Sequence, residues 1–204
     1  MAIEVPSYEL LFVDDKIEYR LYHSYLVAET EVDNADSRSD AANVGFMRLF
    51  DYITGANAQQ TKIAMTAPVQ QSLPTANLTL TSSAQTENAR NWRIAFMLPQ
   101  SYSMADAPLP ASSQIHLRQI PDRLMAVIRY SGRWTEKNIE KHQALLEAHI
   151  NSFGIEILDS PETAFYDPPF MPPFMRHNEV MMEVSSSPAL SRDSVSAQSL
   201  PEGE

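Results

Sequence analysis

The feature that most constrains the fold is a similarity between the two halves of the chain. Residues 17–32 align without a gap on residues 115–130. Both segments begin with Ile, carry Arg three positions later and place a Leu-x-Ala triplet nine positions after the Ile. An internal repeat of this kind predicts two similar structural units that pack against each other.

Short runs rich in aromatic, β-branched and aliphatic residues predict that strands dominate both halves. Strands are expected at residues 7–13, 17–22, 25–32, 62–69, 78–81, 92–98, 115–120, 124–130, 163–166 and 179–184.

Two segments have the apolar spacing of an amphipathic helix instead. The first is residues 40–52, with Gly55 placed to end it. The second is residues 136–152, with Thr135 as the expected N-cap and Gly154 as the stop. Each helix follows two strands that belong to the aligned segments.

The similarity continues beyond the helices, where residues 63–69 align with 164–170 and residues 94–98 align with 180–184. Each half therefore reads strand, strand, helix, strand, strand. The expected fold class is α+β: two pseudo-symmetric βαββ-type repeats that form a distorted antiparallel β-barrel with two helices packed outside.

We expect a single domain over residues 1–184, with the repeats at about 5–98 and 113–184. A cleft between two such repeats is a common place for a ligand. Residues 185–204 are rich in Ser with few apolar groups, which predicts a disordered tail.

Composition excludes several classes of function. The chain has no cysteine, which rules out disulfides, thiolate catalysis and iron–sulfur clusters. The net charge of −11 leaves no basic footprint, so we expect no nucleic-acid partner. No apolar run is long enough to insert into a membrane, and the N-terminal residues do not resemble a signal peptide, so a cytoplasmic location is expected.

Several motifs resemble the SOUL/heme-binding protein family, and they occur in that family's order over roughly residues 5–184. They are Ile17-Glu18-Tyr19-Arg20 followed by Leu26-Val27-Ala28, GFMRLFDYITGAN at 45–57, KIAMTAPV at 62–69, YDPP at 166–169 and RHNEV at 176–180. The resemblance implies a SOUL-like domain of two βαββ-type units and the binding of heme or another porphyrin.

The resemblance also places a tetrapyrrole cleft between residues 44–53 and residues 168–177. The helical side offers Met47, Arg48 and Phe50, and the loop offers Phe170, Met171, Phe174 and Met175. A loop with so many large apolar groups covers something, either a ligand or the end of the barrel core.

Arg48, Lys62 and Arg176 are candidate partners for the two propionates, because cations, and Arg above all, pair well with carboxylates. The alternative is ordinary surface charge. Some family members carry a basic residue where this chain has Pro172 and Pro173, a departure that is expected to weaken propionate binding.

His23 and His177 are candidate axial ligands, and the alternative is a surface or hydrogen-bonded His. One branch of the family has a His at the position of Leu21. Glu179 is of interest because related domains meet cationic ligands with a carboxylate in the cleft; the alternative is a salt bridge that anchors the loop through Arg176.

The sequence contains no phosphate-binding Gly loop and no nucleophile elbow, so no motif points to an enzyme. The predicted function is binding of heme or another tetrapyrrole as a carrier, buffer or sensor. Two alternatives stay open: an enzyme that degrades heme or removes its metal, and a heme-free effector or protein-interaction domain.

Overall fold

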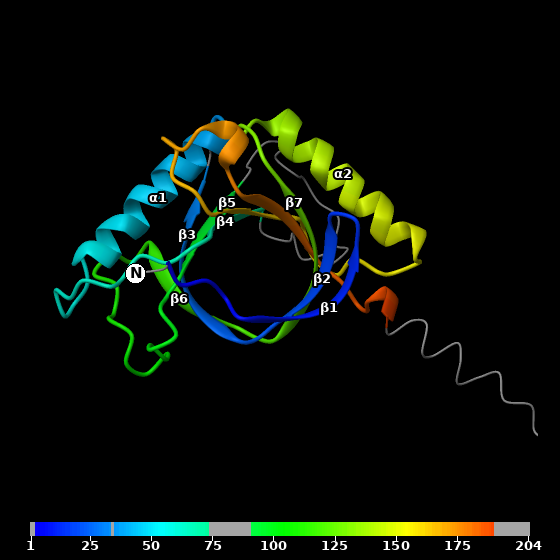
Figure 1. The fold of residues 1–204 in the computed structure, drawn as a ribbon. Coiled ribbons are helices and arrows are strands. Elements are labelled where there is room, and N and C mark those ends of the chain that lie inside the picture. The colour runs from blue at the N-terminus through cyan, green and yellow to red at the C-terminus, as the bar shows by residue number, and fades with distance from the viewer. Residues whose placement is uncertain (1–2, 34, 74–90, 190–204) are drawn as a thin grey trace, which may run out of the picture.

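The computed structural model describes residues 3–33, 35–73 and 91–189, which form a curled nine-stranded sheet with two helices on its outer face (Figure 1). The strands are β1 (Tyr8–Asp14), β2 (Ile17–Tyr22), β3 (Tyr25–Val32), β4 (Val69–Ser72), β5 (Trp92–Met97), β6 (Ile115–Ile120), β7 (Arg123–Tyr130), β8 (Glu162–Phe165) and β9 (Asn178–Glu183). The helices are α1 (Arg38–Thr54) and α2 (Glu136–Ser152), with a short 3₁₀ turn, η1, at Pro173–Met175.

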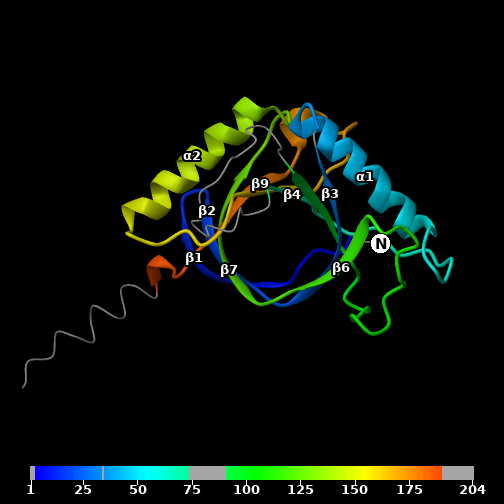
Figure 2. The same ribbon diagram turned by 180° about the vertical axis from the view of Figure 1, so that it is seen from behind.

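All strand pairs are antiparallel, and the sheet order is β1-β2-β7-β9-β8-β4-β5-β3-β6. β4 and β8 pair at the centre of this order, so that β5 and β9 flank them on opposite sides. The sheet curls into a distorted barrel (Figure 2), which confirms the predicted α+β fold.

Each helix begins directly after a residue whose side chain caps it. The side chain of Ser37 accepts a hydrogen bond from the backbone N–H of Asp40, and Thr135 does the same for Asn138. α1 packs closely on β5 because Gly45 has no side chain: a Cβ there would lie 2.7 Å from Ile94. Neither helix in the described ranges has the length and apolarity needed to cross a membrane.

The core divides into three apolar clusters because successive strand residues point to opposite faces of the sheet. One cluster lies between α1 and the sheet, and includes Leu26 and Ile94. A second lies between α2 and the sheet, and includes Ala126. The third fills the barrel interior with the alternate residues, among them Val27 and Met125.

One predicted strand, residues 62–69, is wrong except for its last residue, which begins β4. Its backbone bonds elsewhere: the Ile63 N–H donates to the Ile53 carbonyl at the end of α1, and Thr66 forms an isolated bridge with Glu4. The alignment of 63–69 with 164–170 is therefore out of register with the strands.

The predicted strand at 78–81 lies outside the described residues. Of the predicted tail, the structure describes residues 185–189. There the backbone N–H of Ser185 donates to the carbonyl of Glu156, and Ser187 is buried.

Candidate functional site

The loop between β8 and β9 lies between the N-terminal ends of α1 and α2 (Figures 1 and 2, orange). It is held by the segment that precedes α2 and by bonds within the loop itself. The Gly132 N–H donates to the Pro173 carbonyl at 2.8 Å, and the guanidinium of Arg176 donates to the carbonyls of Met171 and Pro169. The same guanidinium stacks 4.4 Å from the ring centre of Trp134. The contacts of the Arg176 guanidinium therefore stabilise the conformation of the loop.

The loop displays its apolar side chains to solvent. Phe170 is 86% exposed, Phe174 is 78% exposed and Met175 is 61% exposed, whereas Met171 is partly buried. These groups do not cap the barrel core, which was one of the two roles expected of them. Covering them would stabilise a complex by about 25 cal/mol per Å² of apolar surface removed from water.

A groove of about 450 Å³ runs along this loop. Its lining comes from the loop, the β1–β2 hairpin and the end of β7: Lys16, Glu18, Arg129, Tyr130, Ser131, Phe174, Met175 and Arg176. Lys16 and Arg129 are exposed, and neither has an ion-pair partner within the described ranges.

Lys16 and Arg129 were missed from the sequence because they meet only through strand pairing. Ile17 pairs with Ile128 in the β2–β7 ladder, which brings their neighbours to one mouth of the barrel. The available signal was the alternation of β7, which puts Arg129 on the same face as the interior residue Val127.

The predicted residues on α1 do not join this groove. Met47 and Phe50 are exposed on the helix, and Arg48 donates to the Glu31 carbonyl at 2.9 Å and to the Thr30 hydroxyl at 3.3 Å. Lys62 is exposed in the segment after the helix. The structure therefore unites Phe174, Met175 and Arg176 in one groove and leaves the four residues of α1 and its following segment outside its lining.

Behind the loop, the barrel interior contains a buried ion pair between β2 and β9. The Arg20 guanidinium donates two hydrogen bonds to the Glu179 carboxylate, at 3.0 and 3.1 Å, and Glu179 is fully buried. The Tyr166 hydroxyl donates to the same carboxylate at 2.8 Å, and His177 Nε2 lies 2.8 Å from it. The predicted Glu179–Arg176 salt bridge is wrong: the partner is Arg20.

The electrostatics follow from this pairing. Burial alone would raise the pKa of Glu179, but the hydrogen bond from His177 and the charge and hydrogen bonds of Arg20 outweigh it and hold that pKa below its ordinary value. Burial and the neighbouring carboxylate both raise the pKa of Tyr166. The interior is thus a charged but internally satisfied network.

The family described as SOUL heme-binding protein matches residues 3–183. The chain belongs to the SOUL heme-binding protein family. No curated protein sequence matches it.

The fold of this SOUL protein is also found in solved structures of low sequence identity. The EcmrR C-terminal domain is 11% identical with a TM-score of 0.60, over 88% of this chain and 99% of that one. A hydrolase from Listeria innocua is 9% identical with a TM-score of 0.53, over 83% and 92%. SAV2435, solved bound to tetraphenylphosphonium, is 10% identical with a TM-score of 0.50, over 83% and 94%.

The two His residues predicted as axial ligands in this SOUL protein lie at opposite mouths of the barrel. His23 follows Tyr22, which pairs with Arg123 at the start of β7, whereas His177 precedes Asn178, which pairs with Tyr130 at the end of β7. One porphyrin cannot contact both. His177 is close to the groove, but its Nε2 is bonded to Glu179 and its ring stacks on Tyr166 at 4.1 Å.

Proposed function

We propose that this SOUL protein binds heme or another tetrapyrrole in the groove beside the Phe170–Met175 loop, and that it acts as a carrier, buffer or sensor. The observation that carries the proposal is the chemistry of the groove. It combines the exposed apolar side chains of Phe174 and Met175 with Lys16 and Arg129, two cations that have no ion-pair partner among the described residues.

A tetrapyrrole is a flat apolar ring with carboxylates on one edge, and the groove offers a partner for each part. Phe174 and Met175 supply apolar surface for the ring, and Lys16 and Arg129 supply charge for the propionates. A volume of about 450 Å³ lies within the usual range for ligand sites. Arg176 contributes by fixing the loop, because its guanidinium already bonds two loop carbonyls.

The heme-free alternative, an effector domain that meets a cation with its buried carboxylate, has less support. SAV2435 was solved bound to tetraphenylphosphonium, which is a cation. In this chain the buried carboxylate of Glu179 is already neutralised by Arg20, so a ligand cation would have to displace a bidentate ion pair.

A hemin titration followed by visible absorbance tests the proposal. The variant Phe174→Ala with Met175→Ala should lose at least about tenfold in affinity, because it removes the apolar contact. The matched control is Met47→Ala with Phe50→Ala, which removes a similar exposed Met and Phe from α1. If the α1 pair carries the loss instead, or if hemin fails to bind at micromolar concentration, the proposal is wrong.

The same titration tests the role of iron ligation. Affinity from ring and propionate contacts does not need an axial His, so His23→Ala and His177→Ala should each keep most of the affinity. A six-coordinate spectrum abolished by one of these substitutions would show that ligation dominates. Product analysis after adding reductant and oxygen distinguishes binding from heme degradation.

A further inference from the structure

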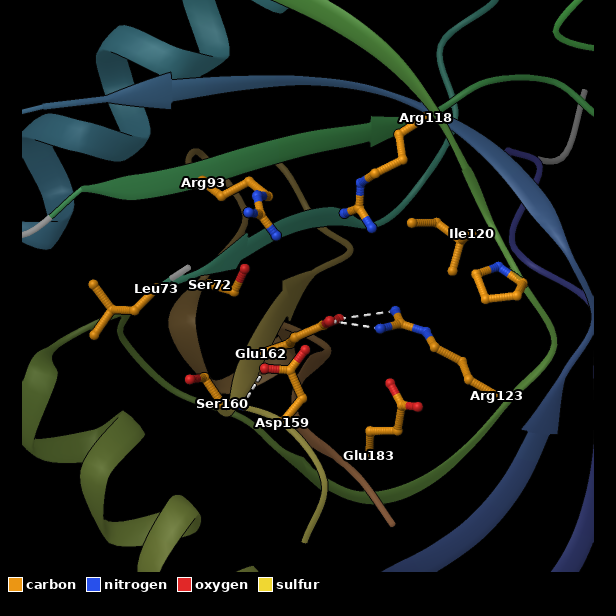
Figure 3. Close-up of a pocket in the computed structure, with 11 residues that line it drawn as sticks. Ser72, Leu73, Arg93, Arg118, Ile120, Arg123, Asp159, Ser160, Glu162 and Glu183 are labelled. Carbon is orange, nitrogen blue, oxygen red and sulfur yellow. Dashed lines mark hydrogen bonds and ion pairs between the residues drawn. The ribbon is translucent and has the colours of Figure 1, made fainter. Parts of the chain in front are cut away.

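A second hollow lies at the opposite mouth of the barrel and takes no part in the proposed tetrapyrrole site (Figure 3). Its volume is about 200 Å³, and its lining includes Arg123 at the start of β7, whereas the groove contains Arg129 near the end of that strand. The lining is polar, with three arginines and three carboxylates around the space.

The arginine side of this hollow is formed by Arg93 on β5 and Arg118 on β6, whose guanidinium groups both point into it (Figure 3). They share one carboxylate: Glu29 lies 2.7 Å from Arg118 and 3.8 Å from Arg93. The Nε of Arg93 is buried and makes no hydrogen bond within the described ranges. Arg93 also forms a second ion pair, in which its Nη2 lies 3.5 Å from the carboxylate of Glu31. Arg118 also donates from its Nε to Glu29 at 2.9 Å, so the remaining capacity for another acceptor lies in the Nη1 groups of the two arginines, which make no hydrogen bond or ion pair within the described ranges.

The acidic side lies across the hollow, where Glu183 at the end of β9 points toward the same space (Figure 3). Its carboxylate has no hydrogen bond or ion pair in the part of the chain that the structure describes. Glu162 lies near it but is neutralised by two hydrogen bonds from Arg123, at 2.6 and 2.9 Å. Burial raises the pKa of Glu183, and Asp159 and Glu162 raise it further against the opposing effect of Arg123.

We infer that this hollow binds a small zwitterion of amino-acid or dipeptide size, with its carboxylate on Arg93 and Arg118 and its ammonium group on Glu183. A simple anion would satisfy the guanidinium groups but would leave Glu183 without a partner. A simple cation would satisfy Glu183 but would leave the free N–H groups of Arg93 and Arg118 without an acceptor. A zwitterion pairs both sides at once, and the small volume limits its size.

Isothermal titration calorimetry with three matched probes tests this inference on the full chain. Glycylglycine carries both charges, N-acetylglycine carries only the carboxylate, and glycylglycinamide carries only the ammonium group. Glycylglycine should bind at millimolar concentration or better, and each blocked probe should bind at least about tenfold more weakly.

Two variants assign the contacts. Arg118→Met and Glu183→Gln should each weaken glycylglycine by at least about tenfold, whereas Glu140→Gln, on the exposed face of α2, should not change it. Arg118 is 44% exposed, so its variant is expected to fold, and the thermal midpoint of each variant checks this. The inference is overturned if no probe binds, if a singly charged probe binds as tightly as glycylglycine, or if both folded variants keep wild-type affinity.

Discussion

The two mouths of the barrel contain the same kinds of side chain, but the charged groups at one mouth are more completely paired than those at the other. At the mouth behind the Phe170–Met175 loop, Arg20 and Glu179 form a buried bidentate pair. In the sequence alignment of the two halves, Arg20 corresponds to Arg118, and Glu179 corresponds to Arg93. Glu29, in turn, corresponds to Val127, so the carboxylate that pairs with the arginine comes from β9 at one mouth and from β3 at the other, where two arginines share it.

This contrast indicates where ligands are to be sought in the molecule. A buried ion pair that satisfies itself contributes order to the interior but has nothing left for a ligand. The groove has exposed apolar groups beside cations that have no ion-pair partner in the described part of the chain, and the hollow has incompletely paired charges. Both places can therefore offer a ligand favourable contacts. Three predictions about stability come first, from the largest expected effect to the smallest, and a binding measurement follows them.

The largest effect is expected from Glu179→Gln, which removes the buried carboxylate that Arg20 bonds twice and leaves Arg20 only its ion pair with the partly exposed Glu18. Breaking a buried pair from one side costs about 3–5 kcal/mol. Urea unfolding of the variant and the wild-type chain at neutral pH measures the cost, with Glu140→Gln as the exposed control. A loss below about 1 kcal/mol would show that the pair is far less important than its burial indicates.

The cost of Glu179→Gln should depend on pH in a defined direction. The pKa of Glu179 is lowered in the folded state, so its stabilisation is complete above the unfolded Glu pKa of about 4.3 and is lost as the pH falls through the folded value. The stability difference between variant and wild type should therefore shrink as the pH falls below about 4. A difference that stays constant between neutral and acid pH would contradict the assigned pairing.

Glu183→Gln should behave in the opposite way. The pKa of Glu183 is raised in the folded state, so its charged form opposes folding at neutral pH and the opposition disappears in acid. The variant should be as stable as the wild type or slightly more stable, by less than about 1 kcal/mol, because the group is partly solvated. Thermal unfolding at neutral pH measures this, and a clear destabilisation would mean that Glu183 has a structural partner.

Much of the fold follows from local sequence. Both helices begin next to a capping side chain and keep a regular apolar period, so the second helix is found at its predicted bounds of 136–152 and the first extends two residues beyond each predicted end. The segment 62–69 has strand-like composition, but it packs Ile63 under α1, which only the assembled core determines.

The site was less accessible from the sequence because it depends on contacts between distant residues. Arg20 and Glu179 are separated by 159 positions, and nothing local selects Arg20 over Arg176 as the partner. Strand alternation offered a partial signal, since Glu179 shares the inward face with Met181 and an inward carboxylate requires a buried partner. The apolar loop was recognisable from composition alone, but its neighbours Lys16 and Arg129 were not.

The central claim is that the two mouths bind separately, with a tetrapyrrole only at the mouth beside the loop. Hemin titrations of two variants test it most directly: Phe174→Ala with Met175→Ala at the groove, and Arg118→Met with Glu183→Gln at the hollow. The account predicts at least about a tenfold loss of hemin affinity in the groove variant and wild-type affinity in the hollow variant. Loss of hemin binding in the hollow variant, with the groove variant unaffected, would contradict it.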